Sequence, residues 1–110
     1  MSRIGVGRVR MPAKAKAGEI IEIRALVEHP MESGFRLNNV GKPIPRHIVD
    51  TFTVSYDGRE VFGVRLHPAV STNPYFVFSL VADRSGDVVF TWKDDQGGIA
   101  AHTARLEVQG

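Results

Sequence analysis

The chain has 110 residues, with 14 Lys and Arg against 12 Asp and Glu, and 43% of its residues are hydrophobic. This length limits the chain to one small domain, expected over residues 1–110, because two independent hydrophobic cores do not fit. The composition is that of an ordinary globular protein and excludes a disordered, collagen-like or membrane-spanning chain. Cysteine is absent, which excludes disulfides, thiolate zinc sites, iron–sulfur clusters and cysteine nucleophiles.

The first 18 residues carry five basic side chains and no acidic one. Basic side chains at this position typically protect an edge strand from unwanted pairing. Nucleic-acid binding is the alternative, but the segment lacks interleaved aromatic residues and any recognisable binding motif. We therefore expect no nucleic acid among the partners.

The beginning of the chain, Met-Ser-Arg-Ile-Gly-Val-Gly-Arg, interrupts any apolar stretch with arginine and glycine, so no secretory signal is visible. No apolar run approaches the roughly 20 residues that a membrane helix needs, and we expect no membrane partner. Taken alone, this pattern indicates a cytoplasmic protein. A chain exported together with a signal-bearing partner would look the same.

The apolar residues change from even to odd positions near Gly7. Ile4 and Val6 occupy even positions, whereas Val9 and Met11 occupy odd ones. One extra residue would bring all four onto one face, so we predict a β-bulge or a switch between sheets near Gly7.

Apolar residues recur with period two along most of the chain, which indicates strands rather than helices. Residues 19–28 place Ile21, Ile23, Ala25 and Val27 on one face, which predicts a half-buried strand. Glu22, Arg24 and Glu28 fall on the opposite face.

Two short alternating stretches, residues 51–56 and 62–66, flank Asp57 and Gly58. An Asp-Gly pair favours the positive φ angles of a tight turn, so we predict a β-hairpin here.

Three more strands are predicted in the second half of the chain, at residues 75–82, 88–92 and 99–108. Gly86-Asp87 is expected to form the turn before the second of them, and residues 94–98 the loop before the third. The side chains expected on their core faces are Phe76, Phe78, Leu80, Val88, Phe90, Trp92, Ala104, Leu106 and Val108. About seven strands with regular turn signals predict an all-β fold, an immunoglobulin-like antiparallel β-sandwich. An open barrel is the alternative architecture.

Two irregular stretches, residues 28–48 and 67–74, resist assignment to strands. The first is rich in proline, glycine and asparagine. Compact domains rarely keep such a long connection without a use, so function is expected in these two loops.

Patterns typical of catalysis are missing. The sequence has no Gly-x-Ser-x-Gly elbow, no phosphate-binding glycine loop and no zinc-binding histidine spacing. Asp94 and Asp95 are adjacent carboxylates, but their setting is too ordinary for glycosidase chemistry and too sparse for calcium. We therefore expect a binding or scaffolding protein, not an enzyme, with no catalytic residues and no cofactor.

His29 and Met31 form the best pair of soft metal ligands, a combination that suits copper if another ligand arrives from elsewhere. The interpretation that we favour is structural: His29 ends a strand and Met31 fills a gap in the core. His67 is expected to end a strand in the same way, and His102 to lie at the surface or an interface.

A series of short motifs resembles one known family in the family's order. They are Arg24-Ala-Leu-Val-Glu-His-Pro-Met-Glu-Ser-Gly34, Ile44-Pro45, Tyr56-Asp-Gly58, Pro68-Ala-Val-Ser-Thr-Asn-Pro-Tyr75, Gly86-Asp87 and Thr91-Trp-Lys-Asp94. The family is SoxZ, the small subunit of the SoxYZ carrier complex of bacterial thiosulfate oxidation. The resemblance extends over about residues 8 to 107.

The resemblance implies an immunoglobulin-like sandwich that acts as the non-catalytic scaffold subunit of a SoxYZ heterodimer. In such a complex a SoxY partner bears a cysteine near the end of a mobile C-terminal arm, which carries sulfur intermediates to SoxAX, SoxB and SoxCD. The resemblance also implies a periplasmic location, reached by co-export with a SoxY partner that has a twin-arginine signal.

A permanent heterodimer interface resembles a core cut in half, so apolar edge and loop residues are expected to form it. The residues that we expect at the partner interface are Met31, Phe35, Ile44, Val70 and Tyr75. Each is equally well explained as a core residue of this domain. The alternative function is a stand-alone immunoglobulin-like binding module that handles copper through His29 and Met31, and an independent enzyme is a third, less favoured one.

Overall fold

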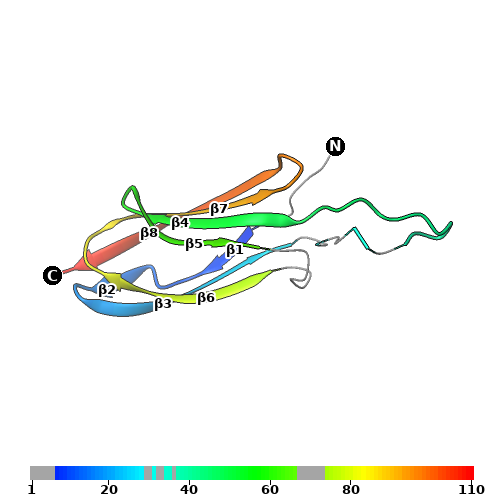
Figure 1. Cartoon of the computed structure of the whole chain (residues 1–110). Coiled ribbons are helices and arrows are strands. Elements are labelled where there is room, and N and C mark those ends of the chain that lie inside the picture. The colour runs from blue at the N-terminus through cyan, green and yellow to red at the C-terminus, as the bar shows by residue number, and fades with distance from the viewer. Residues whose placement is uncertain (1–6, 29–30, 32–33, 36, 67–73) are drawn as a thin grey trace.

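The computed structural model describes residues 7–28, 31, 34–35, 37–66 and 74–110. In this part of the chain it contains eight β-strands (Figure 1). Their bounds are β1 Gly7–Arg10, β2 Lys14–Lys16, β3 Glu19–Val27, β4 Val49–Tyr56, β5 Arg59–Arg65, β6 Tyr75–Ala82, β7 Gly86–Asp94 and β8 Ile99–Gln109.

The strands form two sheets that pack face to face. One sheet has three strands in the order β1-β3-β6, and the other has five in the order β2-β8-β7-β4-β5. Neighbouring strands are antiparallel except for β2, which runs parallel to β8. The predicted all-β sandwich is therefore confirmed.

Alternate side chains of each sheet fill the space between the two layers. The apolar face predicted for residues 19–28 is confirmed, since Ile21, Ile23, Ala25 and Val27 are all buried on β3. Large aromatic rings join the layers. The ring of Phe52 on β4 stacks on Phe76 of the other sheet at 4.8 Å between centroids and on Trp92 at 5.1 Å.

The hairpin predicted at Asp57-Gly58 joins β4 to β5, with positive φ angles of 51° and 82°. The turn predicted at Gly86-Asp87 is wrong by a few residues. The connection lies at residues 83–85, and Gly86 already begins β7. Tyr56 explains this earlier turn, because its hydroxyl donates to the carbonyl of Arg84 and accepts from the backbone of residues 83 and 84.

The beginning of the chain crosses from one sheet to the other. The crossing lies at residues 11–13, between β1 and β2, a few residues after the position predicted near Gly7. Ile4 and Val6, on which the bulge prediction depended, lie outside the described residues. Gly7 has a different role, since a Cβ atom there would clash with the indole ring of Trp92.

About seven strands were predicted and eight are present; β2 is the strand that was not predicted. It has only three residues and buries only Ala15, so its alternation is too short to recognise. It pairs with the last residues of β8 and is an edge strand of the five-stranded sheet.

Candidate functional site

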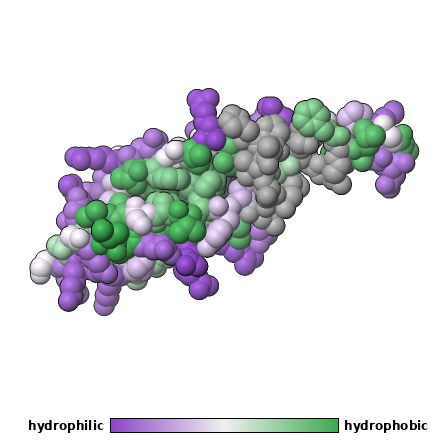
Figure 2. Space-filling model, turned by 60° about the horizontal axis from the view of Figure 1, so that its bottom comes forward, coloured by the Kyte–Doolittle hydropathy of each residue, from purple (hydrophilic) through white to green (hydrophobic). Residues whose placement is uncertain are grey.

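The outer face of the three-stranded sheet carries exposed apolar side chains, whereas its inner face forms part of the core. Leu26 lies opposite Tyr75 and Ile20 lies opposite Val81 in the β3–β6 register. We call this set, Ile20, Leu26, Tyr75, Val77 and Val81, the apolar row. Ile20 is 70% exposed, and Tyr75, Val77 and Val81 are each about half exposed. Figure 2 shows hydrophobic side chains gathered over this face.

The sequence of β6 explains the apolar row. Its eight residues, Tyr-Phe-Val-Phe-Ser-Leu-Val-Ala, are apolar on both faces, apart from one serine. Such a nearly continuous apolar run is typical of a strand that is covered on both sides. The core covers only one side of β6, so the composition of this strand indicates that something else covers the other.

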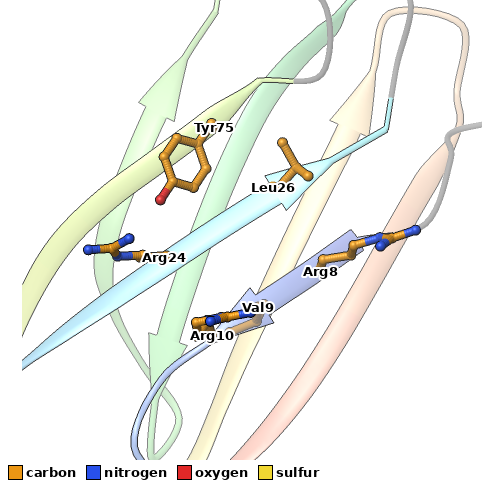
Figure 3. Close-up of a pocket in the computed structure, with 6 residues that line it drawn as sticks. All are labelled: Arg8, Val9, Arg10, Arg24, Leu26 and Tyr75. Carbon is orange, nitrogen blue, oxygen red and sulfur yellow. The ribbon is translucent and has the colours of Figure 1, made fainter.

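A pocket of about 350 Å³ adjoins one end of the apolar row, where β1 pairs with β3 (Figure 3). It is lined by Arg8, Val9, Arg10, Arg24, Leu26 and Tyr75. We call it the arginine pocket. Acidic residues lie beside two of its guanidinium groups, with Arg8 2.7 Å from Glu28 and Arg24 2.9 Å from Glu22. Hydrogen bonding to Glu22, followed by the influence of Tyr75, raises the pKa of Arg24 above its ordinary value.

The long connection between β3 and β4 contains a hairpin that projects beyond the sandwich (Figure 1). We call residues 37–48 the projecting hairpin. Leu37 pairs with Pro43, and the backbone NH of Asn38 donates to the carbonyl of Lys42 at 2.8 Å. The Asn38 side chain also accepts from the backbone NH groups of residues 40 and 42, which closes the tip. The hairpin exposes apolar side chains, with Leu37 59% and Val40 76% accessible.

The projecting hairpin is fastened to the end of the five-stranded sheet by two adjacent carboxylates. Asp94 Oδ2 lies 2.7 Å from His47 Nε2. Asp95 accepts from the backbone NH of Ile48 at 3.1 Å and from Arg46 Nε at 2.9 Å. We call this set of contacts the carboxylate clamp. From the sequence, these two aspartates were considered only for glycosidase or calcium chemistry, and their structural role was not predicted.

Asp94 is buried yet ionised. Burial alone would raise its pKa, but hydrogen bonds from His47 and from the backbone of Gly98 and Gln96 outweigh it, so the pKa of Asp94 lies below its ordinary value. A side chain at Gly98 would clash with this carboxylate. The surroundings of Asp94 therefore stabilise its carboxylate in the charged form, and they leave no room for a side chain at position 98.

The structure places the five predicted interface residues in different environments. Phe35 is 84% exposed before the projecting hairpin, Ile44 is half-buried within it, and Tyr75 is 54% exposed in the apolar row. Met31 is only 6% exposed and belongs to the core cluster. Its position therefore matches the alternative explanation, that of a core residue. Val70 lies outside the described residues.

The predicted soft metal pair is only partly described. His29 and His67 lie outside the described residues. Met31 Sδ accepts a hydrogen bond from the backbone NH of Val49 at 3.2 Å. His102 is half-buried, with its ring 6.2 Å from that of Phe90. Within the described ranges, no group of three or more His, Cys, Asp or Glu side chains could hold a metal ion.

The comparisons with known proteins decide the family. The sequence pattern of the family described as Sulphur oxidation protein SoxZ matches residues 9–105. The chain belongs to the SoxZ family. The resemblance found in the sequence is therefore confirmed over nearly the same residues. No curated protein matches the chain.

Solved structures with the same fold include two kinds of protein. The sulfur carrier protein SoxY from Chlorobium limicola f thiosulfatophilum is 10% identical over 96% of this chain and 80% of that chain, with a TM-score of 0.69. Superoxide reductase (neelaredoxin) from Ignicoccus hospitalis is 17% identical over 96% and 82%, with a TM-score of 0.72. A putative superoxide reductase from Thermotoga maritima is 20% identical over 96% and 87%, with a TM-score of 0.74. At these identities the likeness concerns the fold alone.

SoxZ membership implies a role in the Sox sulfur oxidation system, whose proteins are periplasmic, and implies a SoxY partner. The family is generally non-catalytic. Among the described residues, no helix has the length and apolar character needed to cross a membrane.

Proposed function

We propose that this chain is the scaffold subunit of a SoxYZ heterodimer and takes no part in bond-making itself. Its SoxY partner carries sulfur intermediates on a C-terminal cysteine, and the complex contacts SoxAX, SoxB and SoxCD in turn. The chain reaches the periplasm with the folded SoxY subunit, which bears the twin-arginine signal. The family match over residues 9–105 supports this role.

The observation that carries the proposal is the apolar row. Exposed apolar patches mark protein interaction sites, because soluble monomers rarely keep large ones uncovered. Here the row follows from the sequence of β6, which is apolar on the side away from the core as well as on the core side. A permanent partner is the simplest means of covering such a face.

Residues of the predicted interface contribute to this surface. Tyr75 lies in the apolar row itself and offers a large side chain of the kind that dominates binding energy at interfaces. Phe35 and Ile44 extend the proposed surface toward the projecting hairpin, and Val70 completes the set. Met31 supports the interface from within, since it packs in the core.

The test is co-purification with SoxY from one host. Val77→Asp places a charge in the apolar row, and we expect it to weaken association with SoxY by about tenfold or more, because the complex would take a carboxylate out of water, which Arg24 on the opposite strand offsets only in part. Val61→Asp is the matched control, since Val61 is 43% exposed on β5 of the other sheet. Both variants should fold. Full-yield co-purification of Val77→Asp with SoxY would contradict the proposed surface.

A further inference from the structure

We propose that the arginine pocket binds a tetrahedral sulfur oxyanion of the sulfate or thiosulfate type. The anion is either a free ion or the same group carried covalently on a partner. The choice of sulfur among oxyanions rests on the proposed function. The existence of an anion site rests on the pocket alone.

Two like charges face each other across the β1–β3 pair. Arg10 on β1 and Arg24 on β3 are direct register partners on the outer face of the sheet. Like charges directly opposite each other on neighbouring strands destabilise a sheet. Glu22 compensates Arg24, but no ion pair to Arg10 occurs among the described residues. A bound anion would compensate the remaining charge.

The arginines of the pocket keep hydrogen-bond donors for a ligand. The Glu22 contact engages only Nε of Arg24, so its two Nη groups remain for the Tyr75 hydroxyl and a ligand. The Glu28 contact engages one Nη of Arg8 and leaves the rest of that guanidinium. Each guanidinium has five N–H donors, so these acidic neighbours orient the arginines without exhausting them.

The lining of the pocket combines guanidinium groups with a hydroxyl and apolar atoms. Figure 3 shows the Tyr75 hydroxyl directed toward Arg24, with Leu26 lying between Tyr75 and Arg8. Leu26 and Tyr75 place apolar atoms beside guanidinium groups that stay accessible to a dissolved ion. The pocket volume of about 350 Å³ leaves ample room for a small ion.

The arrangement favours a tetrahedral anion over other acidic ligands. The arginines that line the pocket come from two strands, so a ligand with oxygens pointing in several directions suits them better than one carboxylate does. Arginine matches oxyanions of this kind through paired hydrogen bonds. Nucleic acid would need several stacking rings, and Tyr75 is the only aromatic residue among those that line the pocket.

The test titrates the full chain with sodium thiosulfate and sodium sulfate, balanced with sodium chloride to constant ionic strength, and follows backbone amide NMR shifts. We expect saturable shifts in β1 and β3 around the pocket. Arg10→Gln and Arg24→Gln should each weaken binding by about tenfold or more, because each removes a charged hydrogen bond. Arg65→Gln is the control, since it removes the same charge from an exposed position on β5.

A second measurement separates a ligand site from a general charge effect. In chloride alone, Arg10→Gln should raise the melting temperature by about 1 to 5 °C, because it relieves the repulsion with Arg24. The same variant should lose the rise in melting temperature that thiosulfate produces in the unchanged chain. A site of purely structural importance would not combine these two effects.

The source of the anion is distinguished by a peptide whose cysteine bears an S-sulfonate group. If the peptide binds about tenfold more tightly than the free ions, the pocket receives a carried group, and if the free ions bind as tightly, it receives an ion. The inference is overturned if neither ligand gives saturable shifts, or if Arg65→Gln weakens binding as much as Arg10→Gln. This outcome would leave SoxY co-purification, and with it the proposed function, untouched.

Discussion

The two sheets of the sandwich present very different outer faces, although their inner faces build one core. On the five-stranded sheet, β4 directs Thr51, Thr53 and Ser55 outward, between buried apolar residues. On the three-stranded sheet, the outward positions of β6 are instead mostly apolar. A strand with one polar face, such as β4, needs no cover on its outer side in water, whereas β6, which is apolar on both faces, does. The difference indicates which side of this SoxZ chain is made for a partner.

The shared core is where the largest effect is expected. Phe52 is fully buried and stacks on aromatic rings of both sheets, so Phe52→Ala removes one of the ring contacts that join the layers. We expect a loss of about 3 to 5 kcal/mol in the free energy of unfolding, measured in urea. The outward Thr53→Ala on the same strand should change it by less than about 0.5 kcal/mol. Equal losses would contradict the assignment of inner and outer faces.

The carboxylate clamp ties the projecting hairpin to the five-stranded sheet, and its effect depends on pH. Asp94→Asn should lower the free energy of unfolding by about 1 to 3 kcal/mol at pH 7, because buried hydrogen bonds to a charged acceptor are weakened. The pKa of Asp94 is lowered in the folded chain, so its charge stabilises the fold above the unfolded value of about 3.9. This stabilisation is lost as the pH falls through the folded value.

Urea unfolding of both proteins from pH 7 to pH 3 checks this prediction. The difference in stability between the unchanged chain and Asp94→Asn should narrow at the acidic end. Asp83→Asn, at an exposed carboxylate of the β6–β7 turn, is the control and should show no such narrowing. A difference that stays constant over this range would show that the Asp94 charge does not stabilise the clamp.

The smallest effect is expected on the outer face of the three-stranded sheet. Val77→Thr and Val81→Thr keep the branched shape of the side chain on half-exposed positions. Each should change the stability of the isolated chain by less than about 0.5 kcal/mol, as thermal unfolding will measure. A loss above about 1.5 kcal/mol would mean that the apolar row already serves the fold of the free chain.

The parts of the fold that the sequence predicted are those with local signals. Strict alternation over residues 19–28 was enough to assign every buried position of β3, and Asp57-Gly58 was enough to locate the hairpin. The three residues of β2 are too few to show a period. Its pairing with β8 joins segments far apart in the chain, and nothing local encodes it.

The candidate site was less predictable for the same reason. His47 and Asp94 are 47 residues apart, so their contact exists only after folding. The arginine pocket likewise depends on the register of β1 with β3. The apolar row did have a local signal, the continuous apolar run of β6. The inward residues Phe76, Phe78 and Leu80 already account for a strand with period two, so the pattern alone did not single out the outward residues.

The central claim is that a SoxY subunit covers the apolar row, and hydroxyl-radical footprinting of the free chain and of its complex with SoxY tests it directly. Tyr75 and Val77 should become several-fold less reactive in the complex, whereas Val61 on the other sheet should react as before. Unchanged reactivity of Tyr75 and Val77 in a complex that remains intact would contradict the claim.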